Sequence, residues 1–168
     1  LPFYLHSEII GDLKVCALMV EFKEDNKQST TGNGKFLNTI EGINCESYHI
    51  DPPPHDREYF YSQLKATDSY FRSVSYDEFG IDTISSIIMP IDSSPYTLPY
   101  EMSHYYPYGI DSIADRRLTE LYIHSLEVAY GQDLVNFSDY DLIIVFHAGI
   151  GQDFSLPFLD PTPEDIPS

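Results

Sequence analysis

Histidine and acidic side chains are the residues of this chain best suited to hydrolytic chemistry, because imidazoles bind zinc and carboxylates transfer protons. A catalytic zinc needs about three protein ligands, and a helix commonly supplies two of them through the spacing His-Glu-x-x-His. The six histidines never recur three or four residues apart. The sequence therefore contains no zinc-binding helix of this kind, and a structural role is the default expectation for each histidine.

His147 is the histidine whose position most favours a function. It ends an apolar segment at residues 140–147, and the turn that follows contains Gly149 and Gly151. Glycine permits a sharp change of chain direction, and functional groups often lie where a buried strand meets such a loop. A structural role remains the default for His147, and a role in binding is the alternative.

The acidic residues suit calcium, which prefers hard oxygen ligands beside loops rich in carbonyl groups. No twelve-residue calcium loop is present, and a solvated acidic surface is the simpler interpretation. The candidate calcium ligands lie in three pairs: Asp139 with Asp141, Asp153 with Asp160, and Glu164 with Asp165.

Composition and motifs exclude several classes of partner and enzyme. With 27 acidic and 9 basic residues the net charge is −18, which repels nucleic-acid phosphates and anionic lipids. The longest apolar runs, residues 15–20 and 142–146, are far shorter than the roughly 20 residues that a membrane-spanning helix needs. The sequence also lacks a phosphate-binding loop and the Gly-x-Ser-x-Gly turn of serine hydrolases. We therefore expect neither nucleic-acid nor membrane partners.

The strands of one domain, residues 1–168, can be located from apolar patterning. The chain is 42% hydrophobic, enough for a core, and no linker or repeat interrupts it. Nearly continuous apolar segments at residues 13–22 and 140–147 predict central strands buried on both faces. Residues 79–90, which are rich in β-branched side chains, predict a further strand or a hairpin.

Two helices are expected to pack on this sheet. The first begins at the capping residue Asp56 and runs to about residue 75. The second follows a capping box of Ser112 and Asp115 and ends at Gly131. The order of strands and helices predicts an α/β fold with at least two parallel strands. Helical spacing in the first helix predicts a buried face of Phe60, Leu64, Thr67, Phe71 and Val74.

The positions of glycine, proline and cysteine allow predictions for the rest of the chain. Residues 23–44 predict a long loop with turns of positive φ, and the proline-rich and tyrosine-rich residues 92–109 predict an ordered surface loop. Four prolines in residues 152–168 predict an extended, docked tail. The only cysteines, Cys16 and Cys45, leave open one disulfide or two free thiols.

Six segments of the chain carry a family resemblance: KVCALMVEFKEDN (14–26), TTGNGKF (30–36), IDPPPHDREYF (50–60), YFRSVSY (70–76), YDLIIVFHAGIGQDF (140–154) and DPTPEDIPS (160–168). In this order they resemble the N-terminal half of the catalytic region of secreted zinc metallopeptidases like immune inhibitor A. The resemblance spans most of the chain, with a gap in the tyrosine-rich loop. One departure is Ser75-Tyr76-Asp77-Glu78, where the family frequently has Ser-Tyr-Gly-Lys.

The resemblance implies an α/β zincin-like N-terminal subdomain, with a twisted mixed sheet, parallel central strands and two main helices. The zinc-binding helix of the family follows the part that this chain matches, so zinc is expected only in the full-length protein and this chain alone is expected to be inactive. His147, Gly149 and Gly151 would lie near the sheet edge where extended zincin substrates pair with the enzyme backbone. A secreted or extracellular location is implied, with the remainder of the parent protein or other copies of the chain as partners.

A non-catalytic extracellular module, used for adhesion or assembly, is the alternative function. The 14 tyrosines and 12 prolines would supply contact area at low entropic cost. This alternative would also explain why the chain has no zinc-binding motif.

Overall fold

The computed structural model describes residues 11–39, 53–91, 94–107, 109, 111–151 and 162–166. At its centre lies strand β2 (Val15–Glu21), in which every residue is buried. Such a strand needs apolar side chains on both faces, and the segment VCALMV supplies them without interruption. The prediction of a central strand within residues 13–22 is confirmed.

All strand pairs among the described residues are parallel. On one side β2 pairs with β4 (Ile87–Met89) and β5 (Tyr96–Thr97), and on the other side it pairs with β6 (Leu142–His147) along nearly its whole length. A separate pair joins β1 (Gly11–Leu13) to β3 (Phe79–Ile81). The α/β class and the parallel pairing of β2 with β6 are therefore confirmed. The antiparallel strand that a mixed sheet requires is not found in this part of the chain.

Strand β6 lies at an edge of the described sheet, where we had expected a second central strand. Its residues are half-buried, apart from Leu142, which is 41% exposed. The apolar run LIIVF indicates burial on both faces, but it cannot indicate how many neighbours the strand pairs with. The prediction that residues 13–22 and 140–147 lie side by side in one layer is confirmed.

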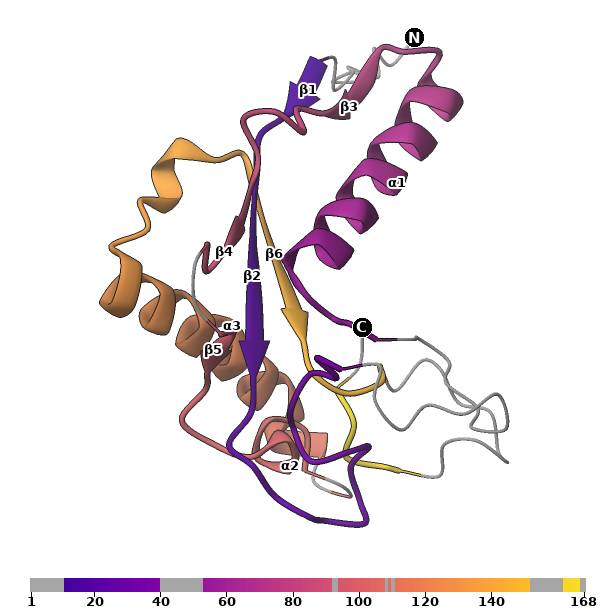
Figure 1. The fold of residues 1–168 in the computed structure, drawn as a ribbon. Helices are drawn as coiled ribbons and strands as arrows, with labels where there is room; N and C mark the ends of the chain where they lie inside the picture. Colours follow the sequence, from indigo (N-terminus) through magenta and orange to yellow (C-terminus); the bar gives the residue numbers. More distant parts are fainter. Residues whose placement is uncertain are drawn as a thin grey trace, which may run out of the picture.

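Helix α1 (Arg57–Ser75) begins where the sequence predicts, because the Asp56 carboxylate accepts a hydrogen bond from the Tyr59 backbone N–H. Phe60 is buried and stacks on Phe146 of β6, with ring centroids 4.6 Å apart. The expected buried face is wrong at Val74, which is 56% exposed. The C-terminal end of α1 packs on the short β3 and extends beyond the main sheet (Figure 1).

Helix α3 (Asp111–Asp133) lies on the opposite side of β2 from α1 (Figure 1). Its buried face holds Leu121, Ser125 and Ala129, which are spaced four residues apart and so lie on one side of the helix. The prediction that Gly131 ends the helix is wrong, because the chain turns only at Leu134, where φ is 52°. With both helices in place, the sheet is covered by one main helix on each side.

The described part of the tyrosine-rich segment, residues 94–107 and 109, contains regular structure and several deeply buried side chains. They contain β5 and the short helix α2 (Met102–Tyr105). The tyrosines were read as surface groups, yet Tyr96 and Tyr105 are almost fully buried. The prediction of a strand or hairpin at residues 79–90 is confirmed as sheet. However, β3 and β4 pair with different strands and not with each other.

The tail and the cysteines are described in part. Residues 162–166 dock on the loop that follows β2, as expected, although they form a turn and not an extended segment. Cys16 is a buried free thiol, and burial raises its pKa to about 11, whereas Cys45 lies outside the described residues. Of the helices in the described ranges, none combines the length and hydropathy of a membrane crossing.

Candidate functional site

The carboxyl ends of β2, β5 and β6 lie at the same end of the sheet, because all three strands are parallel. In open parallel α/β sheets, ligands bind at this carboxyl end. The loop after β2, the turn after β6 and the docked tail residues gather here. We therefore take the carboxyl end of the sheet as the candidate functional site.

His147 is the last residue of β6, at the carboxyl end of the sheet, and it lies opposite Val20 of β2. Its Nδ1 lies 3.0 Å from the Ala148 carbonyl oxygen, and its ring centroid lies 6.1 Å from that of Phe22. Burial lowers the pKa of His147 below the ordinary histidine value. A neutral ring that donates Nδ1–H to a carbonyl keeps a lone pair on Nε2, which suits a base or a metal ligand. His147 therefore lies at the carboxyl end of β6, with its Nδ1 in contact with the backbone.

Gly149 makes the turn after β6 with φ of 95°, a backbone conformation that other residues avoid. A side chain there would also overlap the terminal methyl of the fully buried Met102. The predicted change of direction at this glycine is confirmed. Gly151 lies two residues further on and is half-buried. His147 and Gly149 therefore lie together where β6 ends and the chain turns.

Replacing Gly149 with alanine is expected to lower the free energy of unfolding by about 2 kcal/mol, because the new Cβ adds backbone strain and forces Met102 to move. The matched control is Gly131→Ala. This helical glycine has open space around it, so the same change should be neutral or stabilise by about 0.5–1 kcal/mol. Urea denaturation measures both. A loss at Gly149 no larger than that at Gly131 would refute the strained turn.

The calcium candidates within the described residues are not brought together as a cluster, and Asp160 lies outside those residues. Asp139 is exposed at the end of the short 3-10 helix η1 (Phe137–Asp139), and the Asp141 carboxylate accepts the Lys14 backbone N–H at 2.9 Å. Asp153 lies outside the described residues. No group of three or more His, Cys, Asp or Glu side chains in the described ranges is arranged to hold a metal ion. Calcium binding remains a prediction, which a rise in melting temperature with millimolar calcium over chelator would support.

Asp165 has a structural role that the sequence does not indicate. It is fully buried, and its carboxylate accepts hydrogen bonds from the Thr31 backbone N–H at 2.7 Å and from the Thr31 hydroxyl at 2.6 Å. The neighbouring Glu164 accepts from the Ser29 hydroxyl. These acids were proposed as calcium ligands, but in the structure they fasten the tail to the loop after β2. Contacts across 134 residues of sequence leave no local pattern that could have shown this.

A second polar cluster, which the sequence did not predict, joins α2 to α3. The His104 ring stacks on Tyr100 with centroids 3.9 Å apart, and its Nε2 accepts from Arg117 Nη1 at 2.7 Å. Glu120 pairs with the same guanidinium at 2.6 Å. Burial, followed by the charge of Arg117, lowers the pKa of His104. The arginine donor requires the neutral imidazole, so this cluster is built for an uncharged His104.

The free energy of unfolding is expected to decrease as the pH falls from about 7 to about 5. Both His104 and His147 have a pKa below the ordinary value of 6.5 when folded, so the unfolded chain takes up protons first. The stability that comes from the two neutral imidazoles is complete above pH 6.5. Below that pH, the free energy of unfolding falls by up to about 1.4 kcal/mol per pH unit for each proton that only the unfolded chain binds. Chemical denaturation across this range measures the slope. A His104→Gln and His147→Gln double variant with an unchanged slope would contradict this assignment.

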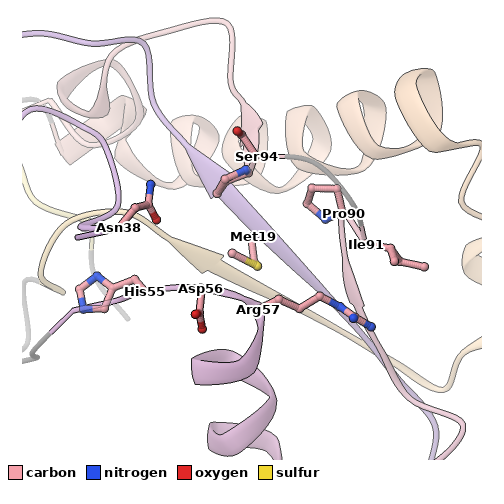
Figure 2. Close-up of a pocket in the computed structure, with 9 residues that line it drawn as sticks. Met19, Asn38, His55, Asp56, Arg57, Pro90, Ile91 and Ser94 are labelled. Atoms are coloured by element: carbon pink, nitrogen blue, oxygen red, sulfur yellow. The ribbon is translucent and has the colours of Figure 1, made fainter. Parts of the chain in front are cut away.

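A pocket of about 440 Å³ opens at the start of α1, on the α1 side of the sheet. Figure 2 shows Met19 of β2 at its centre, Arg57 and Asp56 below it, and Pro90 and Ile91 beside it. The pocket joins residues from five separate stretches of sequence, which explains why no motif indicated it.

Comparison with protein-family models, with curated proteins and with solved structures finds no match to this chain.

Proposed function

We propose that this chain is the N-terminal part of the catalytic region of a secreted, immune inhibitor A-like zinc metallopeptidase, and that it is inactive alone. Six segments that resemble this family occur in the family's order. Two of them, residues 14–26 and 140–154, contain the adjacent parallel strands β2 and β6. A third, residues 50–60, contains the cap and first turn of α1, which packs on β6.

The observation that carries the proposal is the edge strand β6. Within the described residues only β2 pairs with it, and its apolar side chains are half-buried. Proteins usually protect such an edge with charged residues or proline, because an open strand pairs with other chains. In a chain with 27 acidic residues, none of the residues from Leu142 to Phe146 is acidic, basic or proline. This edge is suited to a further strand from the rest of the protein, or to an extended substrate.

In this proposal, residues 1–168 supply the parallel sheet, and the sequence that follows them supplies the zinc-binding residues. A hydrolytic zinc polarises the peptide carbonyl and lowers the pKa of its bound water. In this proposal His147, Gly149 and Gly151 shape the sheet edge and hold no metal. The chain alone therefore should not cleave an unfolded protein when zinc is added.

The test uses the protein expressed with its native downstream coding sequence, beside residues 1–168 alone. We expect the longer protein to hold about one zinc per chain by elemental analysis and to cleave reduced casein until chelator is added. The short chain should do neither. A longer protein without zinc or cleavage would refute the proposal, and so would chelator-sensitive cleavage by the short chain.

A non-catalytic extracellular module is the second candidate, favoured by exposed aromatic side chains. Tyr76 is 91% exposed, and Tyr70 and Tyr130 are each more than 60% exposed. Aromatic residues are enriched at protein interfaces, since they bury large areas with few rotatable bonds. The zinc measurement separates the two candidates, because an adhesion module needs no hydrolytic metal.

A further inference from the structure

Arg57 is the arginine of this chain that has no acidic partner in the described structure. The sequence has four arginines. Arg72 pairs with Asp12 and Asp68, and Arg116 and Arg117 both pair with Glu120. The Arg57 Nε instead donates to the Ile88 carbonyl oxygen at 3.1 Å. In so acidic a chain, this leaves one guanidinium whose two Nη groups can bind an added anion.

The backbone contact holds Arg57 beside the pocket at the start of α1. Ile88 belongs to β4, so the guanidinium is fixed where this strand ends and where Pro90 and Ile91 form the pocket wall. Figure 2 shows the Arg57 side chain extending below these two residues, with Met19 next to it. An arginine held by its Nε loses less freedom on binding, because part of its ordering has already occurred.

The remaining lining is typical of a small-molecule site. Its volume of about 440 Å³ falls within the range of known ligand pockets. Met19 and Ile91 supply apolar surface, together with Pro90 and Pro95, while Asn38, His55 and Ser94 supply further polar groups (Figure 2). Apolar surface beside a small number of placed polar groups is the composition that orients a small ligand.

Asp56 limits the charge of that ligand. Its carboxylate also lines the pocket, and one oxygen already accepts the Tyr59 backbone N–H at 2.9 Å. The Asp56 charge offsets the positive end of the α1 dipole, and a multiply charged anion would be repelled by this carboxylate. One carboxylate matches the two Nη donors of a guanidinium in a bidentate pair.

We propose that this pocket binds a small monocarboxylate. The carboxylate pairs with the Nη groups of Arg57, and an apolar portion contacts Met19 and Ile91. This site lies at the carboxyl end of β4, and the turn that holds His147 is not part of its lining.

The experiment titrates the isotope-labelled chain with benzoate and follows the Met19 methyl and Arg57 Nε signals by NMR. We expect saturable shifts of both signals with benzoate. Benzyl alcohol, of similar size but neutral, should need at least tenfold higher concentration, and inorganic phosphate should not shift the Met19 methyl. Absence of saturation, or equal response to benzyl alcohol, would overturn the proposal, and so would a phosphate response that exceeds that of benzoate.

Variants confirm where the probe binds. Arg57→Gln is expected to weaken benzoate binding at least tenfold, and Arg57→Lys to weaken it by a smaller factor, because charge remains while the bidentate fork is lost. Arg116→Gln, a change at an exposed arginine on α3, is the matched control and should leave binding unchanged. Unperturbed amide spectra elsewhere show that the variants fold. Equal loss in the Arg57 and Arg116 variants would overturn the assignment.

Discussion

Replacing Leu18 with alanine is expected to lower the free energy of unfolding by about 3 kcal/mol. Leu18 is fully buried at the middle of β2, opposite Met89 of β4 on one side and Val145 of β6 on the other. The change removes buried methyl groups and leaves a cavity that the sheet cannot close, since neighbours hold the strand on both sides. Urea denaturation followed by circular dichroism gives the value.

The control for Leu18 is Ile84→Ala. Ile84 is 93% exposed, so its truncation should change stability by less than about 0.5 kcal/mol. Comparable losses at the two positions would mean that β2 is not the centre of the core.

Replacing Asp165 with alanine is expected to lower the free energy of unfolding by about 3 kcal/mol, because the loop after β2 loses a fully buried, charged hydrogen-bond acceptor. The carboxylate receives both the backbone N–H and the hydroxyl of Thr31, and also the Thr162 hydroxyl. Asp165→Asn keeps the shape and one acceptor, and so should cost less. Hydrogen exchange at Thr31 should accelerate in the alanine variant.

The exposed Asp139 supplies the control for Asp165. Asp139→Ala should leave stability within about 0.5 kcal/mol of the starting chain, as expected for a solvated surface group. If Asp165→Ala changed the free energy of unfolding as little as Asp139→Ala, the Asp165 carboxylate would not be what holds the tail on the loop after β2.

The parts of the fold that could be predicted from sequence are those with strong local signals. Uninterrupted apolar residues located β2, and Asp56 located the start of α1, because a helix cap acts within three residues of itself. The end of α3 was misplaced at Gly131, since glycine weakens a helix without having to end it. The tyrosine-rich residues 92–109 were misplaced on the surface because tertiary packing decides the burial of aromatic side chains.

The candidate site was only partly predictable for a related reason. His147 and Gly149 are neighbours in sequence, so a strand followed by a glycine turn was enough to indicate them. Asp165 and Arg57 gain their roles from Thr31 and Ile88, which lie far away in the chain. Such pairs depend on register and topology, and single-residue patterns do not contain that information.

The open edge of β6 is the feature on which the proposed function depends, and backbone hydrogen exchange tests it most directly. In a parallel ladder, alternate residues point their N–H groups to the same neighbour. Ala148 donates to β2 at 3.1 Å, so Ile144 and Phe146 also point inward, whereas Ile143 and Val145 point outward. The account predicts slow exchange at Ile144 and Phe146 and fast exchange at Ile143 and Val145 in residues 1–168, with the latter two slowed in the longer protein. Equal protection at all four amides in the short chain would contradict it.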